Sequence, residues 1–260
     1  MKKILIIGGS GFVSTNLIKY LPENWEIFAT YNSNIIKSEK IKSFKINLLE
    51  TPEKIIPIIQ NIKPDYIIDT VAFPSVDFCE ENHAIADKLH IHATKIISKI
   101  SNEINSKLLF LSTDAVFEGQ LNKKYIETEI TNPVNYYGFT KLKAEKIVLA
   151  SSKNNVVLRT AVIYGVGIQS RFTNWILSYL RDKKPVDPFV DQFNSPTLVD
   201  DLSQVMLKIL KNDISGLFHA TGPTCVNRYD FAVMLANEFN LDSNLIKPVT
   251  SSQKKQNAPR

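Results

Sequence analysis

The chain contains only two cysteines in 260 residues, and neither Cys79 nor Cys225 lies at a spacing used by metal or redox sites. This scarcity predicts no metal site and no disulfide framework of the kind that staples small secreted domains. Long hydrophobic runs are also absent, which predicts no membrane span. The apolar run after Met1-Lys2-Lys3 is too short for a signal peptide, so the sequence predicts a cytoplasmic protein.

A concentrated block of basic residues is missing as well, although the net charge is +5 and the pI is about 9.0. The lysines are scattered and are not interleaved with aromatic residues, so the sequence predicts no nucleic-acid partner. The positive charge gives weak support to a ligand that carries phosphate. The hydrophobic fraction of 44% and the charged fraction of 22% are ordinary for a globular protein of one large domain or two small ones.

Glycine is sparse, with 9 residues in the chain, but three of them gather near the N-terminus. Gly8, Gly9 and Gly11 follow an apolar, β-branched segment over Lys3–Ile7 and precede a helical pattern that begins at Phe12. Strand, glycine turn and helix in this order bring backbone N–H groups and a helix N-terminus to one point, which suits a phosphate group. A tight turn without any ligand is the alternative.

Strand-like and helix-like segments alternate along the chain, which predicts an α/β fold with a Rossmann-type, doubly wound parallel sheet. Beyond Gly165 the alternation weakens. We expect residues 1–165 to form the dinucleotide-binding domain and residues 166–260 a smaller α/β substrate cap over the carboxyl edge of the sheet, with a return strand near 217–220. The predicted strands are Lys3–Ile7, Trp25–Thr30, Phe44–Asn47, Tyr66–Asp69, a segment ending at Thr113 and Val156–Arg159, and one predicted helix is Asn82–Ile100, with Ile85, Leu89, Ile96 and Ile100 on one face.

Tyr137 and Lys141 lie four residues apart on a predicted helix, so they share one face. A lysine cation beside a tyrosine lowers the pKa of the phenol from about 10, which makes the phenol a better proton donor and acceptor near neutral pH. The hydroxyl of Thr113, at the end of a buried strand, can hydrogen-bond the same substrate oxygen. Chance alone predicts about one Tyr-x-x-x-Lys spacing in this composition, and a second one, Tyr179 with Lys183, lies where a helix should end.

Several segments in a fixed order together resemble the extended short-chain dehydrogenase/reductases, in the branch of the dTDP-4-dehydrorhamnose reductases. The resemblance covers nearly the whole chain, and the joint order is more specific than any single segment. It implies that Tyr137 donates a proton, that Lys141 lowers the pKa of this tyrosine and holds the nicotinamide ribose, and that Thr113 binds the substrate oxygen. The segments are GGSGFV at residues 8–13, VDFCE at 76–80, STDAVFEG at 112–119 and YGFTK at 137–141, supported by shorter matches at 158–160, 164–165, 191–192 and 195–197.

The resemblance also implies the residues of two binding sites. The first site would hold a nicotinamide dinucleotide, which supplies the hydride. The second would hold a nucleotide-linked sugar, and a homodimer is a candidate assembly because dimers are common in the family. The implied cofactor-binding residues are Gly8, Ser10, Gly11, Phe12, Val13, Tyr31, Asn32, Asn47, Leu48, Val71, Ala72, Ser112, Tyr137 and Lys141, and the implied substrate-binding residues are Val76, Thr113, Ala115, Tyr137 and Val162.

The residues after the second predicted strand favour NADPH over NADH as the cofactor. NAD-binding chains usually place a carboxylate there, which holds the ribose 2′-hydroxyl. This chain has no carboxylate between Thr30 and Glu39. Asn32, Ser33 and Lys37 can bind a 2′-phosphate, and nothing repels one. NADH is the alternative.

Four positions of the dinucleotide site depart from the family's pattern. Ser14 replaces the third glycine of the turn, and its small side chain still allows close packing of helix and strand. Asp69 replaces an asparagine after the fourth strand, and Asn47 replaces the acid that meets the adenine. His90 replaces an asparagine that steadies the lysine through water. The imidazole either substitutes for that asparagine or is a structural histidine.

The substrate pocket lacks two aromatic residues of the rhamnose-pathway reductases, which carry Tyr at the position of Ala115 and Trp at that of Val162. We expect an NAD(P)H-dependent reductase of a keto group on a nucleotide-linked sugar, and two alternatives stay open. A nucleotide-sugar epimerase or dehydratase is disfavoured by the missing second acid after Asp114. A non-catalytic NADP-binding regulatory subunit, like the beta subunit of methionine adenosyltransferase, is compatible with Asp69, His90 and Ala115.

Overall fold

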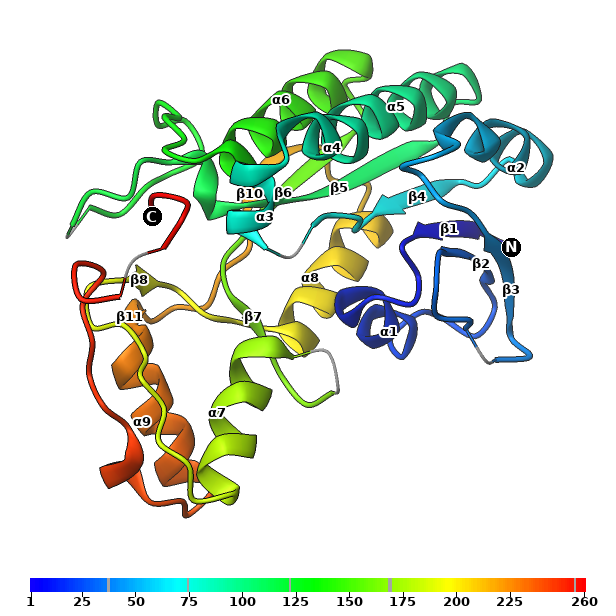
Figure 1. Cartoon of the computed structure of the whole chain (residues 1–260). Coiled ribbons are helices and arrows are strands. Elements are labelled where there is room, and N and C mark those ends of the chain that lie inside the picture. The colour runs from blue at the N-terminus through cyan, green and yellow to red at the C-terminus, as the bar shows by residue number, and fades with distance from the viewer. Residues whose placement is uncertain (37, 74, 122, 168–169, 255) are drawn as a thin grey trace.

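A seven-stranded parallel sheet forms the centre of the molecule, as the computed structural model in Figure 1 shows. The structure describes residues 1–36, 38–73, 75–121, 123–167, 170–254 and 256–260. The strand order is β10-β6-β5-β4-β1-β2-β3, so the order reverses between β1 and β4. This arrangement confirms the predicted Rossmann-type fold, in which ligands bind at the carboxyl ends of the strands near the reversal. The strands are β1 (Lys3–Ile7), β2 (Glu26–Tyr31), β3 (Ile41–Lys45), β4 (Tyr66–Asp69), β5 (Lys107–Thr113), β6 (Val156–Thr160) and β10 (Gly216–His219).

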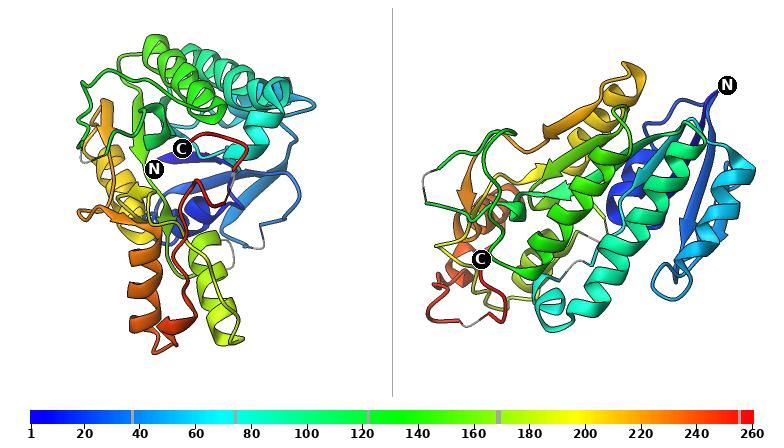
Figure 2. Two further views of the ribbon diagram at one scale, coloured as in Figure 1. Left: turned by 60° about the vertical axis from the view of Figure 1, so that its left-hand side comes forward. Right: turned by 90° about the horizontal axis from the view of Figure 1, so that it is seen from above.

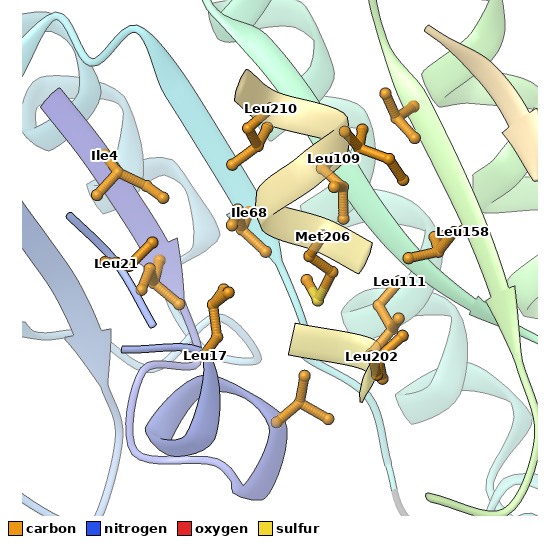
Figure 3. Packing of buried hydrophobic residues seen from close by; sticks show 14 of the residues in the cluster. Ile4, Leu17, Leu21, Ile68, Leu109, Leu111, Leu158, Leu202, Met206 and Leu210 are labelled. Atoms are coloured by element: carbon orange, nitrogen blue, oxygen red, sulfur yellow. The ribbon is translucent and has the colours of Figure 1, made fainter. Parts of the chain in front are cut away.

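Aliphatic residues bury the central strands on both faces, as parallel sheets covered by helices require. On one face lie α1 (Phe12–Ile18) and α8 (Val199–Lys211), and Figure 3 shows Met206 of α8 packed among the sheet residues of this face. The opposite face is covered by α2 (Ile55–Ile62), α5 (Ala93–Glu103) and α6 (Tyr136–Ser151). The sheet is therefore a rigid platform whose carboxyl edge positions the site.

A smaller helical body projects from the sheet, with α7 (Arg171–Arg181) beside α9 (Arg228–Glu238) in both Figure 1 and the left view of Figure 2. The two helices share a hydrophobic core of their own. Helix α9 begins at a side-chain cap, because the Asn227 side chain accepts the N–H of Asp230 at 2.7 Å. Two small sheets join this body to the rest, β7 (Ile163–Tyr164) with β9 (Thr197–Leu198) and β8 (Phe193–Asn194) with β11 (Val226–Asn227).

The helix expected over residues 82–100 differs from the prediction. It is divided into α4 (His83–Asp87), a π-helical turn (Lys88–His92) and α5. The expected buried face is wrong in part, since Ile85 is 38% exposed. Small and polar side chains instead form much of the buried side, because they let neighbouring helices approach closely, and a pattern of large aliphatic residues does not reveal them. The buried residues are Ala86, His90, Ala93, Thr94, Ile97, Ser98 and Ile100.

Two further elements depart from expectation. Strand β3 runs from Ile41 to Lys45 rather than over residues 44–47, because an edge strand with one exposed face alternates polar and apolar residues and lacks an apolar run. Helix α3 (Val76–Glu81) was not predicted, and it is capped by the Ser75 side chain, which accepts the N–H of Phe78 at 3.1 Å. The division at residue 165 stays a prediction, although α8 packs on the sheet. Within the described ranges, no helix is long and apolar enough to cross a membrane.

Candidate active site

The glycine turn joins β1 to α1 where the strand order reverses. Gly8 has a φ of +83°, and a Cβ at this position would lie 2.8 Å from Cγ2 of Val71. The N–H of Gly9 donates to the carbonyl of Thr30 at 2.7 Å, and a Cβ there would lie 2.6 Å from the Cβ of Ala29. Both positions therefore need glycine, because the turn packs tightly between the ends of β2 and β4.

Helix α1 begins after Gly11, which offers no side chain to cap it. Helix N-termini without a side-chain cap carry N–H groups that suit a phosphate. Ser14, in place of the third glycine, is fully buried, and its Oγ lies 2.9 Å from Oγ1 of Thr70. The small serine thus keeps α1 close to the end of β4.

The other residues predicted to bind the cofactor lie along the same edge of the sheet. Tyr31 ends β2 and Asn32 follows it in an exposed position, whereas Val71 and Ala72 follow β4. Asn47 and Leu48 follow β3, and the Asn47 side chain accepts the N–H of Leu49 at 3.0 Å. Contact of these residues with a dinucleotide stays a prediction. Lys37, predicted as a phosphate ligand, lies outside the described residues.

Three contacts fix the first turn of α6, which carries Tyr137. The Asn135 side chain accepts the N–H of Gly138 at 2.9 Å, and the carboxylate of Glu80 accepts the first N–H of the helix at 2.7 Å. A Cβ on Gly138 would lie 2.0 Å from the carbonyl oxygen of Ala115, so the helix rests directly on the backbone after β5. Glu80 and Asn135 were not predicted as site residues, although Glu80 belongs to a segment that carries the resemblance.

Tyr137 lies in the first turn of α6, which packs against the backbone that follows Thr113 at the carboxyl end of β5. Thr113 Oγ1 donates to the Asp114 carboxylate and accepts the N–H of Ala115, both at 3.1 Å. The expected direction of the tyrosine's pKa differs in this structure. Burial, followed by the Asp114 carboxylate, raises the pKa of Tyr137 above its usual value, and the interaction with Thr113 only partly offsets this. Tyr137 is therefore a protonated phenol, the state a proton donor needs.

Lys141 lies one helical turn beyond Tyr137 and is only 2% exposed. Its Nζ donates to the carbonyl of Leu111 at 2.7 Å and lies 3.9 Å from the ring centroid of Phe110. Burial lowers the pKa of Lys141 to about 8, while the carboxylates of Asp69 and Glu145 oppose this shift. The ammonium is thus mostly protonated at neutral pH and is held against the sheet.

Asp69 ends β4 and is 3% exposed. Its Oδ1 accepts the N–H of Val71 at 3.0 Å. Burial raises the pKa of Asp69 to about 6, while Lys141 and this hydrogen bond act in the opposite direction. Asp69 lies opposite Phe110 in the pairing of β4 with β5, and the Lys141 ammonium lies over the Phe110 ring. The Asp69 carboxylate and the Lys141 ammonium therefore lie in the same buried region.

Replacement of Asp69 by Asn should stabilise the protein relative to the wild type by an amount that grows from pH 4 to pH 7, to at most about 3 kcal/mol. The pKa of Asp69 is about 6 in the folded state and 3.8 in the reference state, so the folded protein holds this proton more tightly. The wild type therefore loses stability as pH rises through this window, and the Asn variant does not. Urea unfolding of both proteins at several pH values measures the difference.

Asp213→Asn is the matched control for that comparison. The hydrogen bond from Lys107 lowers the pKa of Asp213 below its reference value of 3.8, so its contribution to stability is present above that pH and is lost only as pH falls below it. The control should therefore be slightly less stable than the wild type, by an amount that stays nearly constant from pH 4 to pH 7. A difference between Asp69→Asn and the wild type that stays constant from pH 4 to pH 7 would contradict the buried ionisation of Asp69.

The imidazole of His90 is held on both sides. Its Nε2 accepts the N–H of Phe73 at 3.0 Å, so Nδ1 carries the proton and faces Oγ1 of Thr140 at 2.8 Å. The Thr140 hydroxyl in turn donates to the carbonyl of Tyr137 at 2.9 Å. Burial lowers the pKa of His90 to about 3, which keeps it neutral. This arrangement supports the structural role: His90 ties the loop after β4 to α6, and both ring nitrogens are occupied rather than directed to Lys141.

The residues predicted to touch the substrate surround the same end of the sheet. Val76 begins α3, Ala115 lies in the 3₁₀ turn after β5, and Val162 follows β6. Val162 has a φ of +28°, which β-branched residues rarely adopt. Its carbonyl accepts the N–H of Thr197 at 3.2 Å, which holds this backbone in place. Strained backbone of this kind clusters at functional sites.

A buried ion pair behind the site was not predicted. Glu145 accepts from Nε and a terminal nitrogen of Arg159 at 3.0 and 2.8 Å, and the two side chains are 2% and 5% exposed. Glu145 also accepts from the hydroxyl of Ser112 at 2.5 Å, so the side chain of Ser112, a predicted cofactor residue, is hydrogen-bonded within the protein. The signal in the sequence is spacing, because Glu145 continues the i, i+4 series of Tyr137 and Lys141 on one helix face.

Curated proteins of two kinds are similar in sequence to this chain. A dTDP-4-dehydrorhamnose reductase from Aggregatibacter actinomycetemcomitans is 29% identical over 246 residues, 92% of this chain and 79% of that protein. Methionine adenosyltransferase 2 subunit beta from Bos taurus is 29% identical over 264 residues, 96% of this chain and 76% of that protein.

Solved structures show the same fold over the whole chain. A dTDP-4-dehydrorhamnose reductase from Bacillus anthracis in complex with NADP has a TM-score of 0.88 at 24% identity, covering 100% of this chain and 88% of that one. A hypothetical dTDP-4-dehydrorhamnose reductase from Sulfolobus tokodaii has a TM-score of 0.88 at 30% identity, covering 99% and 89%. The family model of the RmlD substrate binding domain matches residues 1–260, and this chain therefore belongs to that family.

Proposed function

We propose that this protein is an NAD(P)H-dependent reductase of a keto group on a nucleotide-linked sugar. The packing of the first turn of α6, which carries Tyr137, against the backbone just after Thr113, with Lys141 one helical turn further on, is the observation that carries the proposal. The nicotinamide supplies the hydride when it is bound. Tyr137 keeps its proton until negative charge develops on the substrate oxygen, and then donates it. Thr113 hydrogen-bonds the same oxygen, and the positive charge of Lys141 stabilises the phenolate that remains.

The glycine turn is the site we propose for the dinucleotide. Among proteins of this fold, the Bacillus anthracis relative is solved with NADP and Bordetella bronchiseptica WbmG with NAD, so the fold accepts either cofactor. The chain between Tyr31 and Glu39 contains no carboxylate, which favours NADPH.

Oxidation of NADPH in the presence of a panel of 4-keto nucleotide sugars tests this proposal. We expect turnover with at least one of them, and a lower KM for NADPH than for NADH. Cofactor binding is measured separately by calorimetry. A protein that binds NADPH but reduces none of the keto sugars would contradict the proposed reaction.

A non-catalytic regulatory role is the second candidate, because the subunit beta of methionine adenosyltransferase 2 matches 96% of this chain at the same 29% identity as the reductase. Association with a methionine adenosyltransferase that survives Tyr137→Phe would favour this role. The epimerase alternative would be favoured by protein that purifies with NAD already bound.

A further inference from the structure

A small cavity adjoins the candidate active site on the side of the helical body. Its volume is about 10 Å³, room for roughly one water molecule, and Val162, Phe172, Asn194, Asn227, Arg228 and Phe231 are among its lining residues. Asn194 connects it to the reaction site, since its amide donates at 2.8 Å to Asp114, whose carboxylate accepts the hydroxyl of Thr113.

Arg228 brings a cation to this cavity without using its hydrogen bonds fully. Its guanidinium lies 5.6 Å from the ring centroid of Phe172, a stacking that fixes its position. Its Nε is buried and hydrogen-bonds to none of the described residues. A buried donor without an acceptor is destabilising, and such groups in folded proteins call for a reason such as a missing ligand.

Charged groups of both signs act on Arg228, but no carboxylate hydrogen-bonds its side chain within the described residues. Burial, followed by the Arg260 cation, lowers the pKa of Arg228, and the Asp114 carboxylate opposes this shift. The carboxylates nearby are already engaged. Asp77 forms an ion pair with Arg260 at 2.9 Å, and Asp114 accepts from Asn194 and Thr113.

We propose that Arg228 binds an anionic group of the substrate, a phosphoryl group or a carboxylate. The planar guanidinium presents N–H donors in the fork geometry that such anions match. One oxygen of the anion takes the place of the water that the cavity can hold, and the rest of the ligand extends toward Thr113 and Tyr137. That this anion belongs to the keto substrate, whose carbonyl oxygen is protonated by Tyr137, rests on the proposed function. That Arg228 binds an anion does not.

Calorimetric titration of the NADP-loaded protein tests the inference with defined probes. The probes are dTDP, inorganic pyrophosphate and glucuronate, with thymidine as the uncharged comparison. Arg228→Gln should raise the Kd of the anions about 10- to 100-fold and leave that of thymidine unchanged, because hydrogen bonds to charged groups are among the strong ones. Arg228→Lys, which keeps the charge but loses the fork, should give an intermediate value. If only dTDP and pyrophosphate lose affinity in Arg228→Gln, the bound group is a phosphoryl group. If only glucuronate loses affinity, the bound group is a carboxylate.

Arg181→Gln is the matched control, because Arg181 lies on the same helical body and its guanidinium is 5.7 Å from the ring centroid of Phe239. It should leave every Kd unchanged. The anion affinity of the wild type should also fall between 50 and 300 mM NaCl, a measurement that does not depend on the folding of a variant. Equal anion affinities for Arg228→Gln and Arg181→Gln, or no binding of any anion by the wild type, would overturn the inference.

The two proposals can fail separately. If Arg228-dependent anion binding is found but no keto sugar is reduced, the reaction is refuted and the anion site stands. If NADPH oxidation occurs and Arg228→Gln leaves the KM of the nucleotide sugar unchanged, the anion site is refuted and the reaction stands.

Discussion

Tyr137→Phe should lower kcat by about 10²–10⁴, the usual contribution of a positioned general acid. The variant loses only the hydroxyl that would deliver the proton to the substrate oxygen. The aromatic ring, which makes an edge contact with His90 at 5.6 Å between centroids, is retained. Steady-state kinetics with NADPH and a reactive keto sugar measure the loss, and calorimetry should show cofactor affinity within about threefold of the wild type.

The chain supplies its own control for that experiment. Tyr179 and Lys183 repeat the Tyr-x-x-x-Lys spacing, but Tyr179 is exposed on α7 and Lys183 has a left-handed backbone just after that helix. Tyr179→Phe should leave kcat unchanged. Equal kcat values for the two variants and the wild type would mean that Tyr137 is not the proton donor.

Glu145→Ala should lower the free energy of unfolding by about 3–5 kcal/mol, the usual cost of removing one partner of a buried ion pair. The variant leaves the Arg159 guanidinium buried, with a 3.4 Å contact to His219 and the Phe117 ring at 5.0 Å. It also removes the acceptor of the Ser112 hydroxyl and the link between α6, β5 and β6. Urea unfolding at constant pH measures the change.

Glu103→Ala is the control for the ion pair. Glu103 pairs with Lys99 at 3.9 Å on the surface of α5, where both side chains are largely exposed. Exposed pairs of this kind contribute little, so the control should change stability by less than about 0.5 kcal/mol. If the free energy of unfolding fell by less than about 1 kcal/mol in both variants, the Glu145–Arg159 pair would not be what holds α6 on the sheet.

Local signals predicted most of the fold. Strands β1 and β4 occur at the predicted residues, because aliphatic runs of this length are read directly as buried parallel strands. Tyr137 and Lys141 were found because helical spacing places them on one face, and Thr113 because it ends a buried strand. The glycine turn was found because Gly8, Gly9 and Gly11 stand between a strand pattern and a helix pattern, and the structure shows that side chains at Gly8 and Gly9 would collide with their neighbours.

Features that depend on tertiary contacts were not predicted. The partner of Glu145 is Arg159 on a different element, and no sequence pattern joins the two. The raised pKa of Tyr137 also follows from burial and from Asp114, whereas the spacing to Lys141 alone suggested a lowered value. The π-helical turn around His90 and the backbone of Val162 likewise arise from packing against other elements.

Hydride transfer to the keto group, with Tyr137 as the proton donor, is tested most directly with NADPH that carries deuterium at C4 of the nicotinamide. With an active keto sugar nucleotide and both C4 positions labelled, mass spectrometry should find one deuterium on the new carbinol carbon of the product in the wild type. Tyr137→Phe should form the same labelled product about 10²–10⁴ times more slowly. A wild-type protein that binds the labelled cofactor and the nucleotide sugar but transfers no deuterium would contradict the assignment of Thr113, Tyr137 and Lys141 to hydride-coupled proton transfer.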